Sequence, residues 1–549
     1  MKTGRPAPAA SVAAALARWR AGFVVLFVVE LVLKLLIASR LSPFVDEAFY
    51  WQESRHPAWG YSDLPPLTAW LIRLGEGVAG HGLLGMRWPF LLLGSVLPWL
   101  VVGFARQLQR DDAVEARARH DTAAWQAGVL CLLLPLAGSL GVLALPDVPL
   151  TVAIMLALHA LMRAVDTDRL WAWLLLGVAL AVAWMTHYRA AMAMLVGLLF
   201  CVLTPDGRRL WRRGGLWLAM GVATPGLVPL LVSNWQQRGA GLAFQLVERN
   251  PWSFHADALV QPLEQALSCT PILYGMLLWA AWRSWRRRHD PGAWSLVAVA
   301  AAGFIVLYFV FGLFADDLRF RAHWPLPGYL PLLAVLPTLC RRLPYGRIML
   351  AVSGLFAGVG LAFGLLYLGL AASPQGAAML AGTKAFPSHF TGWRESGVMA
   401  GQLLERKPAL LVADNFMLAA ELDFQLDGRY PVYVLDSPLN TKHGRAAQLA
   451  RWRRDEAALR ADHAGEPMLL GVDETVLRER ERWDWFASLC SRVGRPREAG
   501  RLDLLGGARR LAFYRGQVMS TPATGSAGDP RLCLPWRRAH EAMYGRNAD

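Results

Sequence analysis

The sequence predicts a mainly α-helical bundle that crosses a membrane many times and is followed by an α/β domain. Three observations indicate this fold class. Apolar residues make up 55% of the 549-residue chain and charged residues only 18%, whereas soluble domains usually carry about 25% charged residues. Long apolar runs alternate with short charged loops across residues 21–371. Residues 372–549 instead have the composition of an ordinary soluble domain.

Eleven segments are candidate membrane spans, since a spanning helix needs about 20 mostly apolar residues. The pair 171–186 and 190–204 has an alternative, because the two segments together could form one long tilted helix. The candidates are 21–39, 86–105, 123–144, 148–162, 171–186, 190–204, 214–233, 265–282, 293–314, 325–339 and 348–371.

The distribution of arginine predicts the orientation. If residues 1–20 are cytoplasmic, the basic loops at 106–119, 163–169, 208–213, 283–288 and 341–347 all fall on the same side, as the positive-inside rule requires. Merging 171–204 into one span would separate these loops, which favours eleven spans. An odd number of spans places residues 372–549 on the extracytoplasmic side. The net charge of +15 is therefore interpreted as topology, and no nucleic acid partner is expected.

Residues 372–549 have the pattern of a small α/β domain. Short strands are predicted at 410–413, 431–435 and 468–472, and two more within 502–514 around Gly506 and Gly507. Helices are predicted at 418–426 and 474–489. The last 30 residues are rich in Gly, Pro, Ser and Thr at first and are expected to be loosely ordered.

Cysteines and the first apolar run carry little functional information. The six cysteines show no paired metal spacing; four lie in or beside apolar runs, and Cys490 and Cys533 are candidates for a disulfide if the tail is extracytoplasmic. The first apolar run is expected to be retained rather than cleaved as a signal peptide. Within it, Glu30 and Lys34 are spaced i, i+4 and are interpreted as a mutually satisfied pair.

The first outer loop, 40–85, mixes acids with aromatic residues. Such a mixture suits a sugar, whose hydroxyls need acceptors and whose C–H faces stack on rings. The alternative is an interfacial aromatic belt with solvated acids. The residues concerned include Asp46, Glu47, Glu53, Asp63, Tyr50, Trp51 and Tyr61.

Other outward turns carry polar groups at the same depth. Asp147 follows the third span, His187, Tyr188 and Arg189 form a later turn, and Arg319, Arg321 and His323 precede the tenth span. Each turn alone is more often a helix-end anchor. Together they favour a shared site, in which acids orient hydroxyls and the arginines hold a phosphate.

The motifs at these turns resemble a known family. Val45-Asp46-Glu47-Ala48-Phe49-Tyr50-Trp51, Gly60-Tyr61-Ser62-Asp63-Leu64-Pro65-Pro66-Leu67, Leu145-Pro146-Asp147-Val148-Pro149-Leu150 and His323-Trp324-Pro325-Leu326-Pro327-Gly328-Tyr329 are similar, in this order, to motifs of the dolichyl-phosphate-mannose protein mannosyltransferase-like group. These are bacterial GT-C glycosyltransferases related to the lipid A aminoarabinose transferases. Gly392-Trp393-Arg394-Glu395 and Ala419-Ala420-Glu421-Leu422 also resemble family features.

The resemblance implies an inner-membrane enzyme that takes a sugar from a polyprenyl-phosphate donor. Asp46 matches the family's catalytic acid and Asp147 its second active-site aspartate, and Glu47 beside Asp46 is a further catalytic candidate. Many relatives have His or Lys where this chain has Leu64, a position that helps to hold the donor phosphate. Phosphate binding here is therefore expected to depend more on the arginines and His323. The acceptor is a glycan, a lipid or a protein.

The expected reaction is attack of an acceptor hydroxyl on the anomeric carbon, with expulsion of a lipid phosphate. Asp46 would be the general base, the transition state would resemble an oxocarbenium ion, and arginines would stabilise the leaving phosphate. Tyr50, Trp51, Tyr61 and Asp63 would contact substrate. Catalysis is expected to be metal-free, with a divalent ion at Asp63 and His187 as the alternative.

Two other function classes share these features. A transporter or lipid flippase also has many spans, but it usually places polar groups near the bilayer midplane between repeated halves, and this sequence shows no repeat. A non-catalytic assembly or sensor protein would tolerate loss of both Asp46 and Asp147.

Overall fold

The computed structural model describes residues 8–108, 114–236, 239–243, 247, 252–290, 293–314, 322–475, 488–489 and 492–520. The chain divides into two compact units. Unit 1 comprises Met1–Ser39 and Pro57–Leu368, and unit 2 comprises Arg40–His56 and Gly369–Asp549. Each unit has a hydrophobic core of its own.

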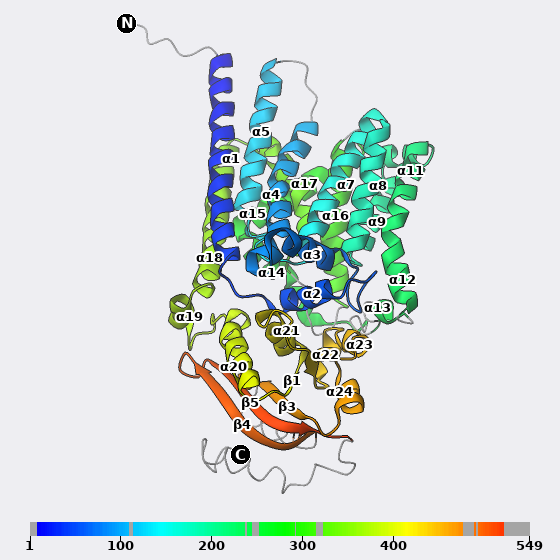
Figure 1. The fold of residues 1–549 in the computed structure, drawn as a ribbon. Coiled ribbons are helices and arrows are strands. Elements are labelled where there is room, and N and C mark those ends of the chain that lie inside the picture. Colours follow the sequence, from blue (N-terminus) through cyan, green and yellow to red (C-terminus); the bar gives the residue numbers. More distant parts are fainter. Residues whose placement is uncertain are drawn as a thin grey trace. The chain divides into compact units, whose positions relative to one another are not determined.

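The described part of unit 1 is built from helices joined by short loops (Figure 1). Its longer helices are α1 Pro8–Ala38, α3 Leu67–Ala79, α4 Leu83–Gln107, α5 Val114–Leu133, α7 Asp147–Thr167, α8 Leu170–Thr186, α9 Ala190–Leu203, α15 Pro271–Trp285, α16 Ala293–Gly312, α17 Leu326–Cys340 and α18 Gly346–Ala371. Shorter elements are α6 Pro135–Gly138, α10 Pro205–Leu210, α11 Gly214–Ala223, η1 Thr224–Leu227, α12 Val228–Gln236, α13 Ala240–Ala243, η3 Ala256–Val260 and α14 Gln261–Cys269.

Each of the eleven predicted apolar segments coincides with helix, although several are interrupted. Among the described residues, six helical stretches are long and apolar enough to cross a membrane, and α8, α9 and α17 are shorter apolar helices. Segment 214–233 is divided by the 3-10 turn at Thr224–Leu227. Segment 265–282 is divided at Thr270, whose φ of 68° lies outside the helical range. The number of spans stays a prediction.

Segments 171–186 and 190–204 form two helices rather than one. His187 follows α8 with φ −159° and ψ 146°, an extended conformation that ends the helix, and α9 begins at Ala190. The Arg189 N–H donates to His187 Nδ1 at 3.0 Å, which fixes the turn. The single tilted helix is therefore excluded, and the turn presents His187, Tyr188 and Arg189 together.

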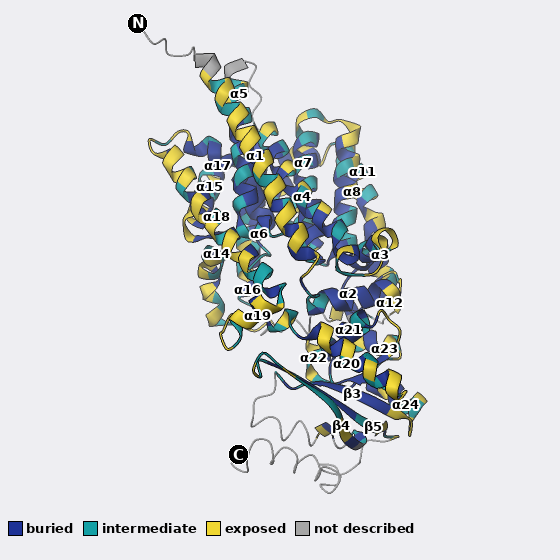
Figure 2. Ribbon diagram, turned by 60° about the vertical axis from the view of Figure 1, so that its left-hand side comes forward, coloured by how far each residue is buried: buried dark blue, intermediate teal, exposed yellow. Residues whose placement is uncertain are grey.

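Helices α1 and α18 carry apolar side chains that no protein atoms cover (Figure 2). Val25 and Val28 of α1 and Phe363 of α18 are at least half exposed. Water would disfavour so many exposed apolar residues on one helix, whereas lipid accommodates them. The exposed apolar surface and the apolar helices identify a multi-pass membrane protein.

Charged and thiol groups within the helices behave as the sequence predicts. Lys34 Nζ lies 3.4 Å from Glu30 Oε1, and both side chains are buried, so the two charges compensate each other inside the bundle. Cys131, Cys201, Cys269 and Cys340 are free and buried. Cys490 and Cys533 lie outside the described residues.

Unit 2 contains a five-stranded mixed sheet with the order β2-β1-β3-β5-β4 (Figure 1). Strand β1 Leu410–Ala413 pairs in parallel with β2 Val432–Val434 and with β3 Pro467–Asp473. Strands β4 Val493–Leu504 and β5 Arg509–Val518 form an antiparallel hairpin, and β5 is antiparallel to β3. Gly506 and Gly507 have positive φ in the hairpin turn, which glycine adopts without strain.

Helices cover both faces of this sheet. Helices α20 Trp393–Arg406 and α21 Phe416–Gln425 pack on each other and against the sheet. Leu459 of α24 Glu456–His463 joins a core cluster with Val412 and Leu470 of the strands. The remaining elements are α19 Pro374–Leu380, η4 Ser388–Phe390, α22 Pro438–Lys442 and α23 Ala446–Arg451. The predicted strands at 410–413, 431–435, 468–472 and 502–514 are present, while most of the predicted helix 474–489 and the last 29 residues lie outside the described residues.

Helix α2, Val45–Arg55, belongs to unit 2 although it precedes most of unit 1 in the sequence. Trp51 is fully buried and its ring packs edge-on against Phe424 of α21 at 5.3 Å between centroids. Phe49 packs similarly on Phe416 at 5.7 Å. The predicted outer loop 40–85 is therefore divided between the two units, because α2 buries its aromatic face on α21.

Candidate active site

In unit 1 the side chains of two residues predicted for the site meet the carboxylate of a third. Asp147 begins α7, where a negative charge is favoured by the helix dipole. Arg189 Nη2 forms an ion pair with Asp147 Oδ1, and His323 Nε2 lies 3.0 Å from the same oxygen. The three residues come from turns far apart in the sequence. The structure thus brings together Asp147, Arg189 and His323, which we call the Asp147 cluster.

Aromatic residues hold the arginine of the Asp147 cluster. The Arg189 guanidinium lies 5.2 Å from the centroid of the Trp324 ring, and that ring lies 5.9 Å from Tyr308. A cation over an aromatic face gains electrostatic energy and is fixed in orientation. Trp324 occurs within a motif used in the sequence analysis but was not proposed for the site, and Tyr308 lies inside an apolar helix where nothing in its surroundings distinguished it.

Asp63 lies close to a second polar group in unit 1. The Asp63 side chain is buried. The pKa of Tyr188 is raised, first by the burial of Tyr188 and further by the negative charge of Asp63. Asn234 Nδ2 donates to the Tyr188 hydroxyl at 3.1 Å, and Asn234 Oδ1 accepts from the Leu242 N–H at 2.8 Å. Tyr188 is adjacent in sequence to Arg189, so Asp63 lies in the same part of unit 1 as the Asp147 cluster. Sequence reasoning missed Asn234, which carries no charge and belongs to no recognised motif.

In unit 2 Asp46 on α2 is paired with an arginine that the sequence analysis did not propose. Arg445 Nη2 donates to Asp46 Oδ1 at 3.2 Å. The Arg445 side chain is 3% exposed and also lies 3.8 Å from Glu53 Oε1. Its guanidinium carbon is 4.2 Å from the centroid of Phe49 and 5.2 Å from that of Tyr50. Arg445 is thus held rigidly between two acids and two rings of α2, and no local sequence pattern links it to Asp46.

The other residues predicted on α2 have structural partners. Glu47 is fully buried, and its Oε2 accepts from the Phe44 N–H at 2.8 Å, which caps the start of the helix. Trp51 has no exposed surface, so its contact with Phe424 replaces the predicted contact with substrate. Tyr50 is 6% exposed and lies under Arg445. Of the predicted α2 residues, Asp46 is the accessible one, with 32% of its side chain exposed.

Tyr61 and Leu64 form a tight turn in unit 1. The Tyr61 N–H donates to the Leu64 carbonyl at 2.9 Å, and both side chains are buried. Leu64, the departure from the family pattern, therefore contributes packing at this turn. Arg319 and Arg321 lie outside the described residues.

No group of three or more His, Cys, Asp or Glu side chains in the described part of the chain is arranged to bind a metal ion. The alternative pair was Asp63 and His187. Because His187 Nδ1 accepts the Arg189 N–H, a neutral His187 carries its proton on Nε2. A metal ligand role for Nε2 would require this hydrogen bond to break.

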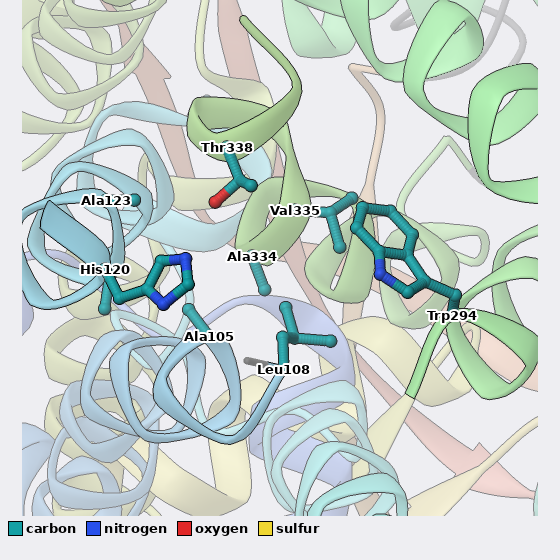
Figure 3. Close-up of a pocket in the computed structure, with 9 residues that line it drawn as sticks. Ala105, Leu108, His120, Ala123, Trp294, Ala334, Val335 and Thr338 are labelled. Carbon is teal, nitrogen blue, oxygen red and sulfur yellow. The ribbon is translucent and has the colours of Figure 1, made fainter. Parts of the chain in front are cut away.

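A small cavity in unit 1 lies apart from these clusters (Figure 3). It is lined by Ala105, Leu108, His120, Ala123, Ala124, Trp294, Ala334, Val335 and Thr338. The lining is mostly apolar, contains no carboxylate, and includes none of the residues predicted for the site. The cavity is therefore not part of the predicted site.

Comparison with known proteins supports a relationship to membrane glycosyltransferases. Residues 63–233 match the model of the dolichyl-phosphate-mannose-protein mannosyltransferase family. The lipid A galacturonosyltransferase RgtD of Rhizobium johnstonii is 26% identical over 435 residues, which cover 78% of this chain and 85% of the relative.

Two solved structures share the fold across nearly the whole chain. ArnT from Cupriavidus metallidurans bound to undecaprenyl phosphate aligns with a TM-score of 0.58 at 17% identity, and its apo form with a TM-score of 0.61 at 16% identity. Each alignment covers 90% of this chain and 98% of the ArnT chain. The identity is low, so these structures establish similarity of fold.

Proposed function

We propose that the chain is a GT-C membrane glycosyltransferase related to the lipid A-modifying transferases, and that it moves a sugar from a polyprenyl-phosphate donor to an acceptor hydroxyl at the extracytoplasmic face. The observation that carries this proposal is the Asp147 cluster, in which Arg189 and His323 converge from separate turns. The N–H groups of a guanidinium and an imidazole are suited to a phosphate whose charge increases as its bond to the sugar breaks.

The proposed roles follow from the chemistry of each group. Asp46 accepts the proton of the acceptor hydroxyl, whose oxygen attacks the anomeric carbon as the C–O bond to the lipid phosphate breaks. Arg189 and His323 stabilise the leaving phosphate, and Asp147 orients both cations while the site is empty. Arg445 positions Asp46. Polyprenyl phosphate and a glycosylated acceptor are the products.

The arrangement of the chain in the membrane forms part of the proposal. Eleven spans with a cytoplasmic N-terminus place residues 372–549, with their sheet and helices, outside the inner membrane. A lipid-linked donor suits that compartment because no nucleotide is required. The relative that acts on lipid A supports a galacturonosyl group as the sugar and lipid A as the acceptor to be tested first.

The experiment uses the purified full-length chain in lipid vesicles with a polyprenyl-phosphate-linked sugar. Release of free polyprenyl phosphate together with a glycosylated acceptor is expected, and Asp46→Asn should lower turnover by about 100- to 10,000-fold. Asp46→Asn turning over at the wild-type rate would show that the base is wrongly assigned. Movement of the intact donor across the vesicle membrane without cleavage would instead identify a flippase.

A further inference from the structure

Arg509, the first residue of β5, is a buried cation, and two of its nitrogen atoms have no hydrogen-bond acceptor among the described residues. Its side chain is 2% exposed, and Nη1 donates to Asp473 Oδ2 at 2.8 Å. Its Nε and Nη2 have no hydrogen-bond partner in the described part of the chain. Burial of charged N–H groups without an acceptor is costly. An arginine kept in this state is therefore expected to have a partner beyond the described residues.

The two N–H groups without a partner form one edge of the guanidinium. Nε–H and Nη2–H point in the same direction, and this pair matches the two oxygens of a carboxylate or phosphate. The plane of the group is fixed from two sides. Asp473 holds Nη1, and the Trp393 ring lies 4.1 Å below the guanidinium carbon. Arg509 is thus oriented in advance for bidentate binding of an anion.

A glycine with a positive φ lies beside the Arg509 side chain. Gly392 caps the start of α20 with φ 87°, and a Cβ atom there would lie 2.9 Å from Arg509 Cγ. Any other residue at this position would be strained and would push against the arginine. Gly392 therefore allows Trp393 and Arg509 to stack closely.

The place of Arg509 in the sheet is where open α/β sheets bind ligands. Strand β1 lies between β2 and β3 and is parallel to both, so the strand order reverses beside β1. Ligands of such sheets bind outside the carboxyl ends of the strands at this point. Asp414 follows β1 and Asp473 ends β3. Arg509 begins β5, the antiparallel neighbour of β3, so it lies at the carboxyl edge of β3 beside Asp473.

The charges at this edge are compatible with an anionic ligand. Burial, and then the charge of Asp473, raises the pKa of Asp414 to about 8. Asp414 is therefore protonated at neutral pH and does not repel an anion. The edge also lies near Asp46, because His389 links the two. The His389 ring is 5.6 Å from that of Phe44. The pKa of His389 is lowered, first by partial burial of its ring, and the charges of Arg509, Asp46 and Asp473 also act on it.

We propose that Arg509, stacked on Trp393, binds an acidic group of the saccharide substrate at the carboxyl edge of β1 and β3. This inference rests on the proposed glycosyl transfer for the identity of the ligand. The shared chemistry is an oxyanion bound by two parallel N–H groups. This oxyanion is either the carboxylate of a sugar or a phosphate on the acceptor. Because both N–H groups are covered in the ligand-free structure, the surrounding side chains must open to admit it.

The test is equilibrium binding to the full-length protein in detergent, which does not depend on turnover. The probes are galacturonate, galactose and inorganic phosphate, the first two differing in the carboxylate. The wild type is expected to bind at least one anion about tenfold or more tightly than galactose. Arg509→Lys, which keeps the charge but loses the paired N–H groups, should abolish that preference. Arg510→Lys on the same strand is the matched control and should retain it.

The outcomes separate this inference from the proposed function. A preference for galacturonate indicates a sugar carboxylate, and a preference for phosphate indicates an acceptor phosphate. If neither anion binds more tightly than galactose, or if folded Arg509→Lys retains the preference, the inference is overturned. Loss of the preference in Arg189→Lys would overturn it as well, since the anion would then bind the Asp147 cluster. If Asp46→Asn fails to affect transfer while Arg509-dependent binding persists, the proposed catalytic role fails and this site stands.

Discussion

At the scale of single residues, the pair of Asp46 and Arg445 shows how the carboxylate that we propose as the general base is held in place. Asp46 is one-third exposed, as a group that meets substrate must be, whereas Arg445 is almost completely buried. The arginine is fixed by contacts with Phe49, Tyr50 and Glu53 in addition to Asp46. The orientation of the carboxylate is therefore set by residues that are themselves immobile, which is the arrangement that proton transfer requires.

The substitution Arg445→Lys tests this positioning role. Lysine retains the positive charge but cannot place two N–H donors between Asp46 and Glu53 or stack a plane on Phe49. We expect kcat to fall about ten- to hundredfold, with little change in the KM for the lipid donor. Steady-state kinetics of the vesicle-reconstituted enzyme separate the two parameters. Arg451→Lys, at an exposed position on α23, is the control; equal losses in both variants, or a loss confined to KM, would contradict the prediction.

At the scale of elements, α2 joins Asp46 to the strands and helices of unit 2. The helix is short, and most of its side chains are buried. Its position depends on Phe49 and Trp51, which pack on Phe416 and Phe424 of α21. Short helices are marginal by themselves, so this packing rather than helix propensity stabilises α2.

Trp51→Ala should therefore weaken both the fold and the reaction. Removing a fully buried indole is expected to destabilise unit 2 by about 3–5 kcal/mol and to lower turnover, because Asp46 loses its fixed support. Trp59→Ala provides the comparison, since the Trp59 side chain is 53% exposed and its loss should leave the apparent unfolding temperature nearly unchanged. Thermal unfolding of the two purified variants distinguishes them. A wild-type unfolding temperature for Trp51→Ala would show that α2 is held elsewhere.

The sequence predicted individual elements better than it predicted their partners. Apolar runs identified the helices, and short continuous apolar runs identified β1, β2 and β3, most of whose residues are buried on both faces of the sheet. The motifs and outward turns identified Asp147, Arg189 and His323. Local patterns contain no information about which distant surfaces pack together.

The assignment of α2 to unit 2 and the partnership of Arg445 with Asp46 therefore could not be predicted. These residues are 399 positions apart, and their contact follows from tertiary packing alone. Trp51 was misassigned for the same reason: an aromatic residue beside acids suits a sugar, and only the presence of Phe424 shows that its ring is buried. Arg509 was missed because nothing in the sequence marks it as buried.

At the scale of the whole molecule, the distribution of arginine and the exposed apolar surfaces of α1 and α18 predict one topology. Cysteine labelling in intact spheroplasts tests it. In a chain with Cys490 and Cys533 replaced by serine, Lys384→Cys should react with a membrane-impermeant maleimide without lysis, because residues 372–549 are predicted outside. His289→Cys, in the predicted cytoplasmic loop between α15 and α16, should react only after lysis. Both positions are exposed, so the reverse pattern would invert the topology.

Stability at the scale of the molecule should depend on pH through Asp414. Burial, reinforced by Asp473, raises the pKa of Asp414 to about 8, whereas an aspartate in the unfolded chain has a pKa of about 3.9. Between these values the folded state holds a proton that the unfolded state releases. The stability from this proton is complete below about pH 4 and is lost as the pH rises to about 8.

Asp414→Asn has no such proton to lose. As the pH increases, the unfolding free energy of Asp414→Asn minus that of wild type should therefore rise by up to about 1.4 kcal/mol per pH unit. This difference should reach a plateau near pH 8. Asp423 is the matched control, because burial raises its pKa only to about 6 while it accepts a hydrogen bond from Gln52. The unfolding free energy of Asp423→Asn relative to wild type should accordingly stop rising near pH 6. Thermal unfolding of the three proteins in one detergent across about pH 5 to 9 measures these differences; a difference between Asp414→Asn and wild type that does not change with pH would show that Asp414 is ionised in the folded protein.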